Sequence, residues 1–331
     1  MTSSLKKKTF LNLFPTPEFL ILSTAGIAIT DFDTKFVQLK REFLGDGFKL
    51  AYASKVVNPT DAVVSGSIGN TEELVSILKK FSSRYGVRYA NATLPEEKAY
   101  LFTAAINWVP REGLRDAVAF IVEDNATVSL SESVFDFEII EESRATGSIK
   151  VAVSVLPQSI VNSYISIFES AGITLVSFDI ESQAIARAVI HSGDRRPHLI
   201  INLSAKKTGF YVVEEEVVQF STTPAYGVGE GDEFSNIDDL KAEMRKVFAF
   251  WNARIDQSSG KEKKLEKVLL CGLGASNKSF VDRLMSESEV PYLVADVWLN
   301  MTEERSHASE IPVDESLDYA SAIGLVLAHR T

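Results

Sequence analysis

Two segments in different halves of the chain share one strand-turn-strand pattern, and this internal duplication constrains the fold more than any other feature. Residues 26–40 read GIAITDFDTKFVQLK and residues 199–213 read LIINLSAKKTGFYVV. In each, an alternating apolar run enters a turn of small, polar and charged residues and leaves as a second alternating run, so that Ala28 aligns with Asn202. Two such turns facing each other could clamp the phosphates of a nucleotide. The pattern therefore predicts a duplicated α/β plan with a cleft between the halves.

The composition is that of an ordinary folded protein. At 331 residues, with 45% hydrophobic and 24% charged side chains, the chain is long enough for two or three subdomains with cores of their own. A formal net charge of -11 repels phosphate backbones, so we expect no nucleic-acid partner. The single Cys271 excludes an internal disulfide and fits a reducing compartment. The four histidines lack metal-ligand spacing and are interpreted as structural or solvated; they are His191, His198, His307 and His329.

The amino-terminal region has some features of a secretion signal. Three lysines at 6–8 precede apolar residues, and the stretch 19–29 is almost continuously apolar. Pro15, Pro17 and Glu18 separate the basic cluster from that stretch, which is also too short to span a membrane and continues into an alternating strand. We therefore predict a cytoplasmic chain with no direct membrane insertion.

The first half divides into a sheet-plus-helix unit and a second mixed unit. Residues 20–54 form three alternating runs joined by turns at 31–34 and 45–47, and a helix is expected over 71–85, where Gly86 ends it. Residues 87–176 have strand signals and two helices of their own, which predicts a small α+β insert between two larger halves. Its strands are expected at 99–108, 134–140 and 148–156, and its helices begin at Pro110 and Pro157.

The second half repeats the plan. The chain first returns to a strand, which is followed by a helix over 181–190. A second meander comes next, with strands near 198–203, 209–213 and 217–223. A helix over 237–255 follows, and then a buried strand at 268–271, a glycine turn at 272–275 and a closing helix at 314–330.

Several segments, taken in order along the chain, carry a resemblance to a known family. Besides the two duplicated turns, they are ATLPEEKAY (92–100), SFDIESQAIARAV (177–189), TTPAYGVGE (222–230), VLLCGLGASNKSF (268–280) and YASAIGLVLA (319–328). The chain resembles the PilM family of type IV pilus assembly proteins, which belongs to the actin-like ATPase superfamily and is related to the division protein FtsA. The ordered set carries the resemblance, because no single segment is specific.

The resemblance implies an α/β, actin-like (ribonuclease H-like) fold of two duplicated lobes. Residues 1–86 would form the first part of the first lobe (1A), and residues 177–196 would return to it. Residues 87–176 would be the inserted 1C subdomain, of the SHS2 type. The second lobe would span 197–313, with 2A carrying a reduced 2B lid at about 232–265, and residues 314–331 would form the closing helix.

The resemblance also implies a partner and a place in the cell. Members of the family bind the short cytoplasmic tail of the inner-membrane protein PilN in a groove between the first lobe and the 1C subdomain. The chain would then be a cytoplasmic scaffold, peripheral at the inner face of the cytoplasmic membrane. Separate motor ATPases drive pilus extension and are possible further partners.

The chain departs from the family at the nucleotide site. The family's first phosphate turn has Asp where this chain has Ala28, and Gly or Ser where it has Thr30. The second turn has Asp-x-Gly where this chain has Asn202, Leu203 and Ser204. Losing both carboxylates removes the usual anchors for Mg²⁺, which neutralises charge during phosphoryl transfer. We therefore expect a degenerate pseudo-ATPase with no catalytic residue and no Mg²⁺ cofactor.

ATP binding without hydrolysis remains open. The phosphate-binding candidates have backbone N–H groups or positive charge, and they are Thr30, Asp31, Lys35, Ser204, Ala205, Lys206 and Lys207. The candidates for the adenosine side and the cleft wall are Gly272, Gly274, Ala275 and Glu181. Asp31 and Asp33 are the candidates for a replacement metal ligand. The alternatives are a solvated hairpin tip, a tight strand-to-helix turn, helix capping by Glu181, and turn aspartates that bond their own backbone.

Two other functions and one N-terminal motif complete the hypotheses. An active ATP-hydrolysing protein of the same fold would need Asp31 or Asp33 to hold a metal. An FtsA-like filament anchored at the membrane would need a terminal amphipathic helix, and none is evident. Residues 11–15 (LNLFP) resemble the Asn-Leu-Leu-Pro-like core of the partner's tail and could occupy its groove in cis. The alternative is an N-terminal strand packed on the first lobe.

Overall fold

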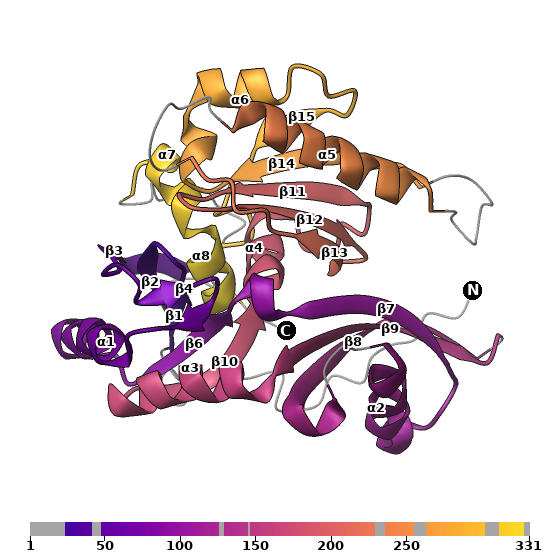
Figure 1. The fold of residues 1–331 in the computed structure, drawn as a ribbon, viewed down its shortest axis with the longest axis horizontal. Coiled ribbons are helices and arrows are strands. Elements are labelled where there is room, and N and C mark those ends of the chain that lie inside the picture. Colours follow the sequence, from indigo (N-terminus) through magenta and orange to yellow (C-terminus); the bar gives the residue numbers. More distant parts are fainter. Residues whose placement is uncertain are drawn as a thin grey trace.

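The computed structural model describes residues 24–41, 48–125, 129–144, 146–228, 236–254, 263–301 and 311–327. Two five-stranded sheets of the same topology form its two lobes (Figure 1). The strand order is β10-β6-β1-β2-β3 in the first sheet and β15-β14-β11-β12-β13 in the second. In both, three antiparallel strands of a meander continue into two parallel strands. The predicted duplication is confirmed.

The duplicated hairpins agree in register as well as in order. Ala28 pairs with Lys35 across the first hairpin, and Asn202 pairs with Gly209 across the second. Ala28 and Asn202 therefore each pair with the residue seven positions further along the chain. Ala28 and Asn202 therefore occupy equivalent positions in the two lobes, as their alignment in the sequence predicted.

The first lobe begins with the meander and its covering helix. Its elements are β1 (Thr24–Ile29), β2 (Asp33–Arg41), β3 (Phe48–Val57), β4 (Val63–Val64), β5 (Ser67–Ile68), α1 (Thr71–Tyr85), β6 (Tyr89–Leu94), α3 (Gln158–Ser170), β10 (Thr174–Ile180) and α4 (Glu181–Val189). The helix α1 has the predicted bounds because its ends are capped. The Asn70 side chain accepts a hydrogen bond from the Glu73 N–H, and Gly86 takes the left-handed conformation with φ 68°.

A three-stranded antiparallel sheet with one helix projects from the first lobe. It consists of β7 (Tyr100–Asn107), α2 (Leu114–Asn125), β8 (Ser133–Ser143) and β9 (Ser148–Pro157), in the strand order β7-β9-β8. The helix α2 packs on one face through Leu114, Val118 and Val122. The boundary differs from the expected 87–176, because β6 and β10 in that range pair within the sheet of the first lobe. The small sheet and α2 occupy residues 100–157.

The second lobe combines the second sheet with helices, of which α5 and α6 contact each other. Its elements are β11 (His198–Leu203), β12 (Thr208–Glu214), β13 (Val217–Thr222), α5 (Ile237–Asn252), β14 (Lys267–Cys271), α6 (Lys278–Leu284), β15 (Tyr292–Val294), α7 (Val313–Ser316) and α8 (Ala320–Leu327). The expected closing helix is two helices, since α7 and α8 are separated by a 3-10 turn at Leu317–Tyr319. That turn places Asp318 against lysines of the first lobe.

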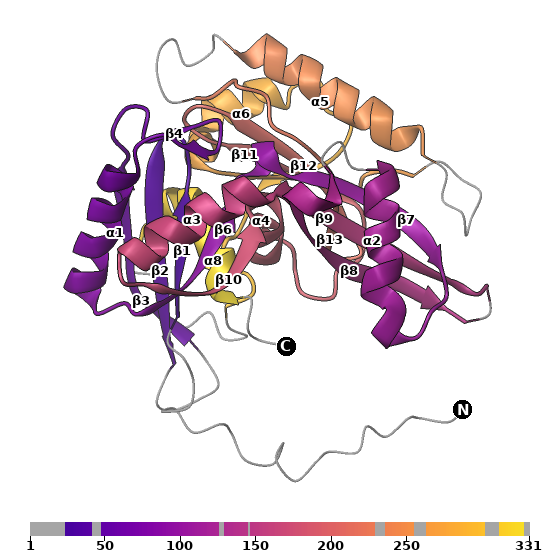
Figure 2. The same ribbon diagram turned by 60° about the horizontal axis from the view of Figure 1, so that its bottom comes forward.

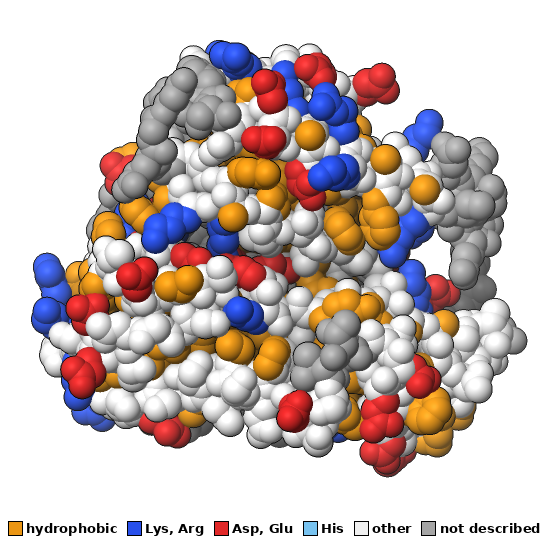
Figure 3. Space-filling model, viewed as in Figure 1, with side chains coloured by type: hydrophobic (Ala, Val, Ile, Leu, Met, Phe, Trp, Pro, Cys, Tyr) orange, Lys and Arg blue, Asp and Glu red, His pale blue; other side chains and the backbone are white. Residues whose placement is uncertain are grey.

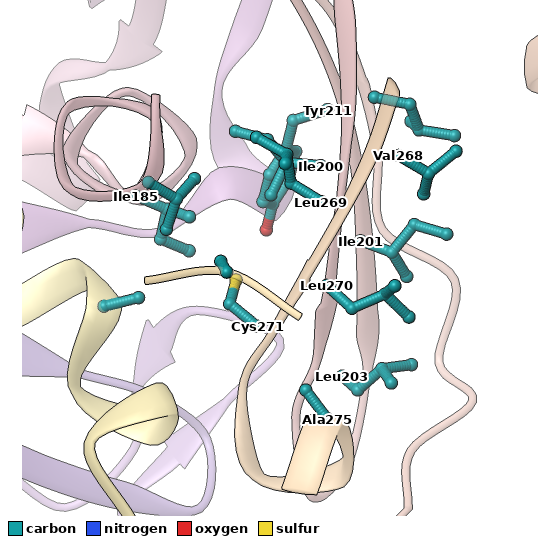
Figure 4. Close-up of a cluster of buried hydrophobic side chains, with 14 of the residues drawn as sticks. Ile185, Ile200, Ile201, Leu203, Tyr211, Val268, Leu269, Leu270, Cys271 and Ala275 are labelled. Carbon is teal, nitrogen blue, oxygen red and sulfur yellow. The ribbon is translucent and has the colours of Figure 1, made fainter. Parts of the chain in front are cut away.

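The helices α4 and α8 cross between the two sheets and form the centre of the molecule (Figures 1 and 2). One continuous apolar core contains residues of both helices together with β11, β12 and β14. Figure 4 shows Ile185 of α4 facing the strand residues Ile200, Leu269 and Tyr211. This shared core holds the lobes to each other through buried apolar surface.

Some expectations fall on residues that the structure does not describe. These are the LNLFP motif at 11–15, the turn at 45–47, and residues 232–235 and 255–262 of the lid region, in which α5 is described. None of the helices in the described ranges is long and apolar enough to cross a membrane.

Candidate functional site

A lysine clamp joins the two lobes where the phosphate turns face each other. Lys207, in the turn between β11 and β12, donates from Nζ to Glu97 Oε1 at 2.8 Å and lies 3.1 Å from Glu181 Oε2. All three side chains are 17% exposed or less. Burial alone would lower the pKa of Lys207, but the carboxylates of Glu181 and Glu97 raise it overall. The ammonium therefore stays protonated, and an ion pair bridges the lobes.

A second lysine cluster lies beside the first phosphate turn. Lys35 Nζ is 2.9 Å from Asp33 Oδ1 and 3.0 Å from Asp318 Oδ1, and Lys55 Nζ is 2.9 Å from Asp318 Oδ2. Burial opposes the charge on Lys35, but Asp33 and Asp318 raise its pKa overall. Burial likewise opposes the charge on Asp318, but the two lysines lower its pKa. On the face shown in Figure 3, acidic side chains gather along the junction of the lobes with basic ones directly above.

The first phosphate turn is closed by its own hydrogen bonds. Thr30 Oγ1 donates to Asp33 and accepts from the Asp33 N–H at 3.0 Å. The Asp31 carboxylate accepts from the N–H groups of Ser65 and Gly66 at 2.8 and 3.0 Å. Lys206 Nζ donates to the Asp31 carbonyl oxygen at 3.2 Å. Asp31 and Asp33 are therefore occupied as backbone and lysine partners rather than presented as metal ligands.

The expected adenosine residues do not reach this cleft. Gly272 has φ 86° and lies against Asn202, since a Cβ there would be 2.6 Å from Asn202 Oδ1. Gly274 packs on Val228, and Ala275 is buried. The cavity between the phosphate turns is lined instead by residues of the turns themselves with Leu273 and Asp318.

Little free space separates the phosphate turns in the observed arrangement of the lobes. The cavity between the turns measures about 10 Å³, which is enough for about one water. A ligand of nucleotide size needs a pocket of roughly 300 Å³ or more. The ammonium group of Lys35 pairs with the Asp33 carboxylate, and that of Lys207 pairs with the Glu181 carboxylate. These carboxylates, which could have held Mg²⁺, are therefore already neutralised. Within the described ranges, no group of three or more His, Cys, Asp or Glu side chains is arranged to hold a metal ion.

Some members of this cleft were predicted from the sequence, and others were not. Thr30, Asp31, Lys35 and the turn residues 204–207 are brought together as expected, and Glu181 reaches Lys207 from the N-terminus of α4. Glu97, Lys55 and Asp318 were missed. Glu97 stands in the quoted segment ATLPEEKAY, directly after a buried strand, and this position was the available signal.

An apolar groove separates the three-stranded sheet from the first lobe. It is a cavity of about 240 Å³ with walls from β8, β9, β10, the start of α4 and β13. The small side chains of Ala152 and Ser154 lie at its β9 wall, and Phe178 and Ile180 of β10 line it opposite the β8 residues 134–138. The groove lies between the first lobe and the small sheet, with Val217 and Val218 of β13 also in its lining.

The two lobes define the class of protein. Two sheets of the same topology, with their hairpin turns facing each other across a cleft, form an actin-like fold. The solved structure described as "PilM-PilN type IV pilus biogenesis complex" superposes with a TM-score of 0.77 at 17% identity, over 93% of this chain and 98% of that one. The ethanolamine utilization protein EutJ from Carboxydothermus hydrogenoformans has a TM-score of 0.53 at 12% identity, over 95% of this chain and 90% of that one.

The sequence identifies the family within this class. Residues 26–243 match the family described as type IV pilus assembly protein PilM. The chain belongs to the PilM family, and the resemblance noted in the sequence is confirmed. A comparison with curated proteins finds no match.

Proposed function

We propose that this chain is a scaffold of type IV pilus assembly that holds the cytoplasmic tail of a PilN-like inner-membrane protein. The apolar groove of about 240 Å³ beside β8 carries the proposal, because it is open, largely apolar and bounded by the small sheet. The family match and the likeness to a structure named for a PilM-PilN complex support the choice of partner. The scaffold would work in the cytoplasm, at the inner face of the membrane that holds its partner.

The scaffold is proposed to work without nucleotide turnover. The Lys207 clamp joins the lobes directly, so no bridging phosphate or Mg²⁺ is needed to hold them together. Ala28 and Asn202, at equivalent positions of the two hairpins, provide no carboxylate for a metal. We therefore assign no catalytic residue and no step of phosphoryl transfer to this chain.

Filling the groove is expected to abolish tail binding. Ala152→Trp would place an indole in the cavity, since Ala152 lines the groove, while its neighbours Val151 and Val153 belong to the core under α2. We expect the affinity for a fluorescein-labelled synthetic peptide of the host's PilN-like cytoplasmic tail to fall about 100-fold, which corresponds to about 2.7 kcal/mol. Fluorescence anisotropy measures it.

Ala105→Trp is the matched control for this substitution. Ala105 is exposed on β7 and lies outside the groove lining. The control variant should bind the peptide as the parent chain does, and both variants should melt cooperatively. Unchanged binding by a folded Ala152→Trp variant would place the tail elsewhere.

Calorimetric titration of ATP tests the second part of the proposal. With a cavity of about 10 Å³ between the turns, we expect no saturable heat with or without Mg²⁺. The same sample must bind the tail peptide, which shows that it is folded. A Mg²⁺-dependent Kd in the micromolar range, about 8 kcal/mol of binding free energy, would contradict the proposal and revive an active ATPase.

A further inference from the structure

The groove has an unpaired strand along one side. In the three-stranded sheet β8 pairs with β9 alone, so its other edge is free over the described sheet. Five consecutive residues of β8, 134–138, line the groove. Side chains alternate between the faces of a strand, so Val134, Asp136 and Glu138 face the groove while Phe135 and Phe137 pack toward α2. A free strand edge is a ready template for another extended segment.

At the outer edge of β8, backbone groups bond to side chains in place of a neighbouring strand. The Phe137 N–H donates to the Asp136 side chain at 2.9 Å, and the Phe135 carbonyl oxygen accepts from Arg115 at 3.5 Å. In an antiparallel pair, alternate residues direct both backbone groups toward the partner strand and the residues between them direct both away. Phe135 and Phe137 are therefore the positions whose backbone groups face away from β9, and the Asp136 and Arg115 side chains bond to two of those groups.

The side chains that β8 presents to the groove change from apolar to acidic along the strand. Val134, Asp136 and Glu138 lie on the groove face of β8, opposite Leu156, Ser154 and Ala152 of β9. No salt bridge to Glu138 occurs in the described part of the chain. Glu138 also borders a second cavity of about 480 Å³, which adjoins the groove at Gln183 and leaves room for a long side chain.

The electrostatics at this end of the groove favour a cation. Partial burial raises the pKa of Glu138, Arg187 opposes this rise, and the carboxylates of Asp179, Asp136 and Glu216 add to it. Arg187 is already paired with Asp179 at 2.8 Å. A basic side chain placed here would relieve the repulsion among the remaining carboxylates, and cytoplasmic segments next to a membrane span are enriched in Lys and Arg.

We propose that the PilN-like tail binds as an extended strand added to the outer edge of β8, with an apolar side chain beside Val134 and basic side chains opposite Asp136 and Glu138. This inference rests on the proposed function. Strand addition supplies affinity through backbone hydrogen bonds to Phe135 and Phe137, and the graded side chains set the register of the tail.

A scan of N-methylated peptides tests the strand. A series of synthetic tail peptides, each methylated at one backbone nitrogen, is titrated against the full chain. We expect losses of about tenfold or more at every second nitrogen and small changes at those between, because only alternate N–H groups face β8. Uniform tolerance, or losses without the two-residue period, would overturn strand addition. If the unmodified peptide fails to bind, the proposed function itself fails.

Neutral substitutions of the acidic pair test the register. In the double variant Asp136→Asn with Glu138→Gln, we expect the peptide to bind about fivefold to tenfold more weakly and with a shallower dependence on salt. Glu141→Gln is the matched control, since Glu141 is an exposed residue of β8 outside both cavities. Equal salt dependence in the double variant and the control would overturn the basic-residue assignment. Formation of a dimer through β8 that the peptide cannot dissociate would overturn the choice of occupant.

Discussion

Replacing Lys207 by methionine is expected to lower the free energy of unfolding by about 3 kcal/mol or more. The methionine keeps the length of the side chain but removes the ammonium, which leaves the carboxylates of Glu97 and Glu181 buried and unpaired between the lobes. Breaking one side of a buried ion pair costs more than the pair contributes, because the remaining charge keeps its desolvation penalty. Urea unfolding followed by circular dichroism measures the difference.

The pH dependence of this effect follows from the raised pKa of Lys207. The folded-state pKa lies above the unfolded value of about 10.4, so the stabilisation is complete below that pH and is lost only as the pH rises through the folded value. The stability difference between the parent and Lys207→Met should therefore be constant between about pH 7 and pH 9. A difference that disappears across this window would contradict the assignment of the clamp to a protonated lysine.

The neighbouring lysine provides the control, and the carboxylates provide a rescue. Lys206 is exposed and donates to one backbone carbonyl, so Lys206→Met should change the stability by no more than about 0.5 kcal/mol. Adding Glu97→Gln and Glu181→Gln to Lys207→Met should recover part of the loss, because no buried charge is then left unpaired. If Lys207→Met and Lys206→Met unfold at the same urea concentration, the clamp does not hold the lobes together.

The architecture of the lobes could be predicted because its signals are local. The alternation through 26–40 and 199–213 gave both hairpins, whose registers agree residue for residue. The helix α1 was predicted with its bounds because Asn70 and Gly86 are strong terminal signals. Patterns of this kind depend on residues a few positions apart, and a sequence displays them directly.

The features that were missed depend on partners distant in the sequence. Lys207 and Glu97 lie 110 positions apart, and Lys55 and Asp318 lie 263 apart. Asp318 carries no local mark of whether it will be solvated or buried against an opposite charge, so it could not be selected among the 45 acidic residues, and Glu97 had only its position after a buried strand. The boundary of the insert was misjudged for the same reason, since β6 and β10 join their sheet by parallel pairing across long connections.

Replacing Gly324 by alanine is expected to destabilise the centre of the molecule by about 3 kcal/mol. A Cβ at this position of α8 would lie 1.7 Å from the carbonyl oxygen of Ala184 in α4, a backbone atom that cannot turn aside. Alanine would otherwise favour the helix by about 1 kcal/mol, so the sign of the effect depends on this contact. The helix α8 also lies close to β1, because a Cβ at Gly26 would be 2.2 Å from the Ala322 carbonyl oxygen. The helix α8 is therefore in close backbone contact with both α4 and β1.

The effect of Gly324→Ala should extend to the groove. The groove is lined by Ser182 and Gln183 at the start of α4, so a displaced α4 alters the wall on which the tail would rest. We expect a lower melting temperature together with weaker binding of the tail peptide. Gly113→Ala is the control, since a Cβ there meets no atom within 4 Å, and it should leave both measurements unchanged. A Gly324→Ala variant that melts and binds as the control does would mean that the α4–α8 contact tolerates the methyl group. The close packing of these helices would then not couple the lobes to the groove.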